Sequence, residues 1–327
     1  FNTSQPSLDP RDQQPVVQWL TLVNLAKEPR EFRVRTVQEG GTVLRDLSVV
    51  LAPFERADLD GGHGLAGTNS RGVHEVTPVG DERAPFVALL TRYGTTFDPD
   101  RFAFAFPSFP RSAAEIALPI STGGGAGAWI ELANLDDEPR DVYYSVHDTT
   151  GEHSLSSSVP LAAYEHRHFY VPSLIPENSS GTFLYSVRGN VLGQVVSYYY
   201  SPTGGIQTAF VSPGEARRKQ LQYASYNTFL GMYNWLRLIP YSFPTGPTVQ
   251  VRAAGTGEVL GAQTVNISPF GVRELDIHNS ELWGSVPNSY GLVEVDNVQA
   301  YPTVVELLRV RPTVRGALDF IMRTTVE

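Results

Sequence analysis

"WLTLVNLAKEPR" occupies residues 19–30, and "WIELANLDDEPR" occupies residues 129–140. The two stretches begin a gapless alignment in which Trp19 meets Trp129, and the similarity continues well beyond the quoted residues. A match of this length at one fixed interval, here 110 residues, is the pattern of an internal repeat. The sequence therefore predicts that one unit is present at least twice.

A fainter third copy begins at Trp235 with "WLRLIP" and closes with "ISPF". In all three copies the tryptophan is followed 35 residues later by an aromatic residue; these residues are Phe54, Tyr164 and Phe270. Glycine recurs at one shared position in each copy; these residues are Gly41, Gly151 and Gly257. We therefore predict three domains: residues 1–115, which include a polar N-terminal arm, residues 116–222 and residues 223–327.

Apolar and polar residues alternate in segments such as "WLTLVNL", "DVYYSV" and "TVQVRA". A period of two places one face of a strand on a core, and the turn-forming stretches "QEGG", "DTTGE" and "GTGE" separate such strands. The predicted fold class is all-β, with three tandem antiparallel β-sandwich repeats of about 100 residues each. In architecture alone, this plan resembles the tandem immunoglobulin-like sandwiches of bacterial surfaces. The repeated tryptophan is expected to anchor each core.

The composition limits the classes of function. A net charge of −9 in 327 residues disfavours binding to a nucleic-acid backbone. The absence of cysteine excludes disulfides, thiolate metal sites and cysteine nucleophiles. No run of 18 apolar residues predicts a membrane span. Because the chain begins with Phe1, removal of a leader peptide is expected, and with it an extracellular, cell-surface or periplasmic location.

Motifs of catalysis are missing from the sequence. It contains no G-x-S-x-G elbow, no H-E-x-x-H pair and no P-loop. We therefore expect a protein that is not an enzyme and that carries no cofactor.

Four of the seven histidines fall within 22 residues; they are His147, His153, His166 and His168. The first two flank a predicted hairpin turn, and the other two share one face of a strand. Neutral imidazoles in such an arrangement bind Zn²⁺ or Cu²⁺. The favoured interpretation is a polar surface strand, and a metal site is the alternative.

Tyrosines gather in the second copy, where Tyr143, Tyr144, Tyr198, Tyr199 and Tyr200 are candidates for an interface or a ligand site. Adjacent residues of a strand point to opposite faces, so one member of each adjacent pair is expected outside the core. Exposed aromatic rings stack on sugars or bury against another protein. The favoured interpretation is an aromatic-lined sandwich, followed by a protein interface and then by a glycan site.

These observations lead to a hypothesis about function. We expect a non-catalytic, exported structural protein that self-associates or binds other surface proteins, as a subunit of a surface layer, sheath, filament or stalk. The arm of residues 1–15 is expected to reach a neighbouring subunit. The alternative is an adhesin-type module that binds a carbohydrate or a receptor through the aromatic residues of the second copy. A metal-dependent enzyme using the histidines ranks third.

Overall fold

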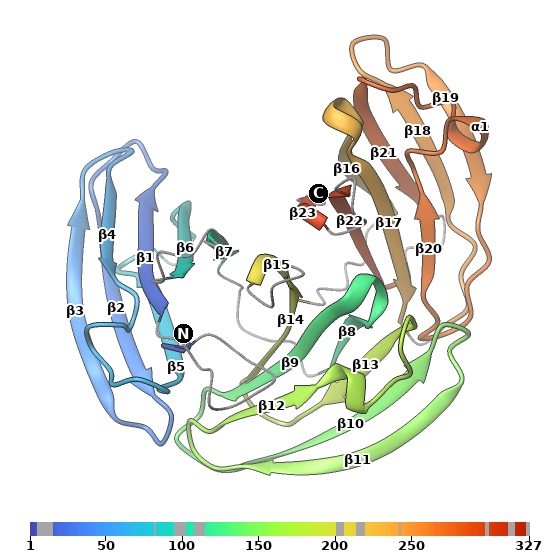
Figure 1. Cartoon of the computed structure of the whole chain (residues 1–327). Coiled ribbons are helices and arrows are strands. Elements are labelled where there is room, and N and C mark those ends of the chain that lie inside the picture. The colour runs from blue at the N-terminus through green and yellow to red at the C-terminus, as the bar shows by residue number, and fades with distance from the viewer. Residues whose placement is uncertain are drawn as a thin grey trace.

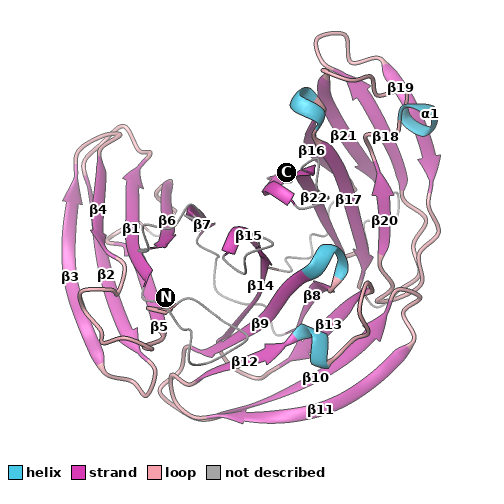
Figure 2. Cartoon of the chain, in the orientation of Figure 1, coloured by secondary structure: helices cyan, strands magenta, loops and turns pink. Residues whose placement is uncertain are grey.

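The computed structural model describes residues 1–4, 16–81, 83–94, 103–107, 115–200, 206–213, 220–241, 243–297, 301–312 and 318–324. Strands dominate these residues, and the helical segments are single short turns (Figure 2). The strands form six sheets, in which every pairing among the described residues is antiparallel. The prediction of an all-β antiparallel protein is confirmed.

The first two sheets pack on each other and are called here the first sheet pair. The inner sheet has the order β4 (Arg56–Asp60), β1 (Val16–Asn24), β6 (Phe86–Gly94), β7 (Ala103–Pro107), and the outer sheet has the order β3 (Val43–Leu51), β2 (Arg30–Gln38), β5 (Gly72–Pro78). Leu20 and Leu22 from the inner sheet meet Phe32 and Val34 from the outer sheet in one buried cluster. Burial of this apolar surface holds the two sheets together.

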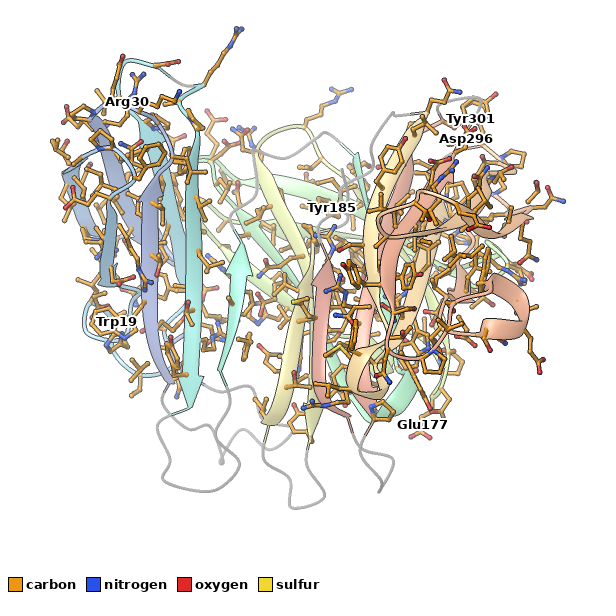
Figure 3. All side chains as sticks on the ribbon, turned by 90° about the horizontal axis from the view of Figure 1, so that it is seen from above. Trp19, Arg30, Glu177, Tyr185, Asp296 and Tyr301 are labelled. Carbon is orange, nitrogen blue, oxygen red and sulfur yellow. The ribbon has the colours of Figure 1, made fainter. Side chains whose placement is uncertain are left out.

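The second sheet pair follows the same plan around its own core. The inner sheet has the order β12 (His166–Tyr170), β9 (Ala126–Asn134), β14 (Val191–Tyr200), β15 (Ile206–Ser212), and the outer sheet has the order β11 (His153–Leu161), β10 (Arg140–Asp148), β13 (Ser180–Ser186), β8 (Glu115–Ser121). Ile130 and Leu132 meet Val142, Phe183 and Tyr185 in this core. Tyr185 lies inside the sheet pair (Figure 3).

The third sheet pair has the same strand order. The inner sheet has the order β20 (Arg273–Asp276), β17 (Tyr233–Pro240), β22 (Thr303–Pro312), β23 (Leu318–Thr324), and the outer sheet has the order β16 (Leu221–Asn227), β21 (Tyr290–Asp296), β18 (Thr248–Ala253), β19 (Val259–Thr264). Its core includes Trp283 from the one-turn helix α1 (Ser280–Trp283). The sheet pairs thus have separate apolar cores.

A threonine that precedes the strands β1, β9 and β17 makes the same hydrogen bonds in each sheet pair. The backbone N–H groups of Thr3, Thr122 and Thr228 donate to Ser70, Ser179 and Ser289 O, each at 2.9 Å. Each threonine hydroxyl accepts from the backbone N–H of the same serine. The preceding asparagines have positive φ in all three places, a conformation that asparagine tolerates; they are Asn69, Asn178 and Asn288.

The first residues of the N-terminal arm lie against their own chain. Asn2 bridges Arg71, and Thr3 is bonded to Ser70, so residues 1–4 pair with their own chain beside β5 and occupy the place that β8 and β16 take in the other sheet pairs. The expectation that the arm of residues 1–15 reaches a neighbouring subunit stays a prediction. The remainder of the predicted arm, residues 5–15, lies outside the described residues.

The prediction that the repeated tryptophans anchor the cores is wrong. Leu20 and Leu22 face the first core, so the alternation of β1 turns Trp19 to the other face, where its side chain is 41% exposed (Figure 3). Trp129 and Trp235 hold the same strand positions, and both pack against clusters that lie between sheet pairs. Both faces of the inner sheets carry apolar residues, so the pattern did not identify the face that meets the core.

The three sheet pairs form an arc in chain order, with the second between the first and the third (Figure 1). Strands β7, β15 and β23 lie toward its centre, where β15 contacts both of the others. The first and third sheet pairs are the two ends of the arc (Figure 1). None of the helices in the described part of the chain is long and apolar enough to cross a membrane.

Candidate functional site

Two contacts connect the sheet pairs, and we call them the first junction (first and second pairs) and the second junction (second and third pairs). At the first junction the hairpin between β2 and β3 meets the turn between β11 and β12. Glu39 Oε1 accepts a hydrogen bond from His166 N at 3.2 Å. A Cβ atom on Gly41 would lie 3.0 Å from Cδ2 of Tyr164, and the guanidinium carbon of Arg35 lies 5.8 Å from the centre of that ring. The tyrosine therefore rests directly on the hairpin.

The second junction uses the same two elements, one unit further along the chain. The hairpin between β10 and β11 meets the turn between β19 and β20, where Thr149 O accepts from Val272 N at 3.0 Å. A Cβ atom on Gly151 would collide with the carbonyl oxygen of Pro269. The ring of His147 lies 4.8 Å from that of Phe270. We call the hairpin element the docking hairpin (residues 38–42, 148–152 and 253–258) and the turn element the docking turn (residues 52–55, 162–165 and 268–271).

The aromatic residue of each docking turn is held in an unusual backbone conformation. Phe54, Tyr164 and Phe270 have φ of 60°, 56° and 60°. Positive φ is uncommon for a bulky residue and costs energy unless the surroundings maintain it. Tyr164 and Phe270 are half-buried under a docking hairpin, whereas Phe54 is 63% exposed. One docking turn therefore carries the same strained aromatic residue with no covering hairpin among the described residues.

Apolar clusters complete both junctions. In the first, Val16, Phe104 and Phe106 of the first sheet pair meet Tyr198 and other residues of the second. In the second, Ala126, Tyr199 and Phe210 of the second sheet pair meet Trp235, Leu308, Val310 and Ile321 of the third. Ala117 of β8 also meets Ile239 and Val304 of the third sheet pair. Burial of this kind resembles a domain core more than a loose contact between domains.

The predicted tyrosine site is divided among different surroundings. Tyr198 and Tyr199 are 1% and 8% exposed, the first in the first junction and the second in the second junction. The Tyr198 hydroxyl accepts from Arg92 Nη1 at 3.0 Å, and burial raises the pKa of Tyr198 above its ordinary range. Tyr200 packs against the first-junction cluster. These tyrosines join parts of one chain and do not form an external surface together.

The other two tyrosines lie on the outer sheet of the second pair. Tyr144 packs against the core, with its ring stacked on Phe183 at 5.0 Å. Tyr143 points away from that core and is 62% exposed. The expected separation of adjacent residues to opposite faces therefore holds for this pair.

The predicted histidine group is also divided. His147 and His153 are register partners across the β10–β11 hairpin, with ring centres 5.6 Å apart at the second junction. His166 and His168 lie on β12, at the first junction. Within the described part of the chain, no three His, Cys, Asp or Glu side chains are grouped so that they hold a metal ion. Burial lowers the pKa of His147, His166 and His168, which favours neutral rings.

A row of polar side chains crosses the inner sheets of the second and third pairs, where the preceding sheet pair meets each of them. In the second pair, Glu131 lies between its register partners His168 and Gln194, and Gln194 Nε2 donates to Glu131 Oε2 at 2.8 Å. Burial raises the pKa of Glu131, but the neighbouring His168, the charge of Arg92 and the hydrogen bond from Gln194 outweigh it, and the pKa is lowered. The carboxylate is thus ionised inside the first junction.

In the third pair the same row has Arg237 at the centre. Arg237 Nη2 lies 2.7 Å from Glu274 Oε1, and Arg237 Nη1 lies 3.0 Å from Glu306 Oε2. Glu306 is 1% exposed and is also bound by Arg323 and by the Ser212 hydroxyl of the second sheet pair. Sequence reasoning passed over Glu306, although a single acid inside the apolar stretch "PTVVELLRV" was a usable signal.

Comparison with known proteins adds no assignment. No protein family matches the sequence, and no curated protein matches it significantly. The surfaces that the chain itself uses to join its parts are therefore the observations on which a function can be argued.

Proposed function

We propose that the chain consists of three tandem immunoglobulin-like β-sandwich repeats that arose from one unit. The shared strand order of the three inner sheets, the recurrent threonine and the positive-φ aromatic residue support this interpretation. The predicted boundary after residue 115 falls at the start of β8, and the boundary after residue 222 falls within β16. If each repeat begins with the first strand of its sheet pair, the second repeat starts at Glu115 and the third at Leu221.

We further propose that the protein is a non-catalytic, exported structural protein that works by assembly, as a subunit of a surface layer, sheath, filament or stalk. One observation carries the proposal: at both junctions the docking hairpin of one sheet pair meets the docking turn of the next. A contact that is built twice within a chain is a general means of adding units. Clusters that bury large aromatic residues favour a stiff arc over three loosely linked domains.

Sedimentation velocity and electron microscopy of the purified protein test this proposal. Structural assembly predicts particles larger than one chain that grow as the protein concentration rises. A protein that remains a single chain over the whole accessible range would contradict it.

The alternative, a carbohydrate- or receptor-binding module, retains less support. Tyr198 and Tyr199 are buried, so Tyr143 is the most exposed of the five tyrosines considered. A glycan array with the wild-type protein and Tyr143→Ala separates the two functions. Sugar selectivity that is lost in Tyr143→Ala would favour the binding module.

A further inference from the structure

The first sheet pair exposes four large apolar side chains on its inner sheet and docking turn. Trp19 is 41%, Phe54 63%, Val87 41% and Tyr93 39% exposed. We call these four residues the head patch. Single exposed apolar residues are common on protein surfaces, whereas a set at related positions requires an explanation.

Each member of the head patch has at least one counterpart at an internal junction. The three repeated tryptophans have register partners on the neighbouring strand, namely Thr91 for Trp19, Val196 for Trp129 and Leu308 for Trp235. Tyr93 lies two residues after Thr91. The residues at the same position in the other two sheet pairs are therefore Tyr198 and Val310. Those two counterparts are 1% and 0% exposed. The aromatic of the docking turn follows the same rule, because Tyr164 and Phe270 are half-buried.

Val87 shows the relation again at another position. Val87 is the register partner of Val23. The residues at the same position in the second and third sheet pairs are Leu192, opposite Ala133, and Val304, opposite Ile239. Val304 is 2% exposed in the second junction. The head patch thus corresponds in position to the surface by which the second and third sheet pairs receive the preceding sheet pair.

The third sheet pair presents the complementary element. Its docking hairpin contains Gly257, which has φ of 71° and no atom within 4 Å of where a Cβ would lie. Gly41 and Gly151, at the same place in the other hairpins, are covered by a docking turn. The docking hairpin of the third sheet pair is therefore one that nothing in the described structure covers.

Arg252 lies beside this hairpin. Arg252 is the register partner of Val259, and His147 is the register partner of His153 at the same place in the second sheet pair. Arg252 therefore corresponds to His147, whose ring contacts that of Phe270. Two hydrogen bonds from Arg252 to Glu294 orient its guanidinium group. An aromatic ring placed over this group would gain a cation–π contact.

We propose that the head patch of one chain docks on the hairpin of residues 253–258 in a second copy of the same chain. This inference rests on the proposed structural function and specifies its contact. The second copy is the chosen partner because the contact would continue an interface that the chain already forms twice. Such a head-to-tail contact is heterologous, so it closes into a ring or continues as a helical filament.

Two asparagine variants test the contact. Phe54→Asn removes the ring, and Gly257→Asn places a side chain where the docking turn would lie. Asparagine tolerates the positive φ of both positions, so the single chain should remain folded. Tyr143→Asn is the control, because Tyr143 is 62% exposed and lies outside both surfaces. Val87→Ser is a second head variant should Phe54→Asn fail to fold.

We expect sedimentation velocity to show an association constant lower by about tenfold or more for each interface variant, with no change for Tyr143→Asn. An equimolar mixture of Phe54→Asn and Gly257→Asn should form dimers and nothing larger, because one intact head and one intact hairpin remain.

Two results would overturn the inference. If the wild-type protein assembles and the interface variants assemble equally well, the contact is wrong while the structural function stands. If the wild-type protein remains a single chain at every concentration, the contact and the structural function both fail.

Discussion

The second and third sheet pairs place opposite charges at one position of the same polar row. Glu131 lies between His168 and Gln194, whereas Arg237 lies between Glu274 and Glu306. The common sheet geometry requires that a polar side chain at this position be satisfied where the junction shields it from water. The identity of the residues in each row determines how the stability of that junction changes when one partner is removed or when the pH is lowered.

Removal of one carboxylate should have the largest effect. Glu306→Ala leaves Arg237 and Arg323 without a buried partner, and we expect the free energy of unfolding to fall by about 3–5 kcal/mol. Glu131→Ala removes a hydrogen bond from neutral Gln194 and should cost about 1–3 kcal/mol. Urea unfolding of both variants checks the order, and equal losses would show that the two rows are not energetically different.

The three hairpin glycines distinguish the two junctions from the free end. Ala at Gly151 must displace backbone atoms of residues 269–271, so we expect a loss of about 3 kcal/mol. Ala at Gly41 meets the Tyr164 ring, which can shift, and should cost about 1–2 kcal/mol. Ala at Gly257 meets nothing and should cost about 1 kcal/mol, for its positive φ alone.

Thermal and urea unfolding of the three alanine variants, at concentrations where the chain does not associate, measures this series. A loss at Gly257 as large as that at Gly151 would contradict the view that the last hairpin is free.

Acid should weaken the first junction through its histidines. Burial lowers the pKa of His166 and His168 in the folded chain, so below about pH 6.5 the unfolded chain binds more protons than the folded chain. The free energy of unfolding therefore decreases as the pH decreases. Each histidine contributes at most about 2 kcal/mol of this loss between pH 6.5 and 5.0. The double variant His166→Gln/His168→Gln should therefore flatten the pH dependence of the urea midpoint.

His153→Gln is the matched control for that experiment, because His153 is an exposed histidine of the same sheet pair. An unchanged slope in the double variant, or a slope flattened as much by His153→Gln, would show that the acid response originates elsewhere.

Individual residues show which features of the structure could be predicted from the sequence. The spacing between Trp19 and Phe54 marked corresponding positions in all three units, and the shared glycines do adopt positive φ in hairpins. The same pattern misplaced the tryptophans, because alternation along β1 is equally compatible with either face meeting the core. His147 and His168, 21 residues apart, lie at different junctions, because β10 and β12 belong to different sheets.

By itself the sequence determined the strands and the turns between them, since these depend on local periodicity and on residues that tolerate positive φ. The tertiary structure alone decided which apolar residues build a core and which join one unit to the next. It also decided that Phe54 is left exposed while Tyr164 and Phe270 are half-buried. The physical reason is that burial depends on what packs against a residue, and residues with the same local sequence pattern have different neighbours at the end of the arc and within it.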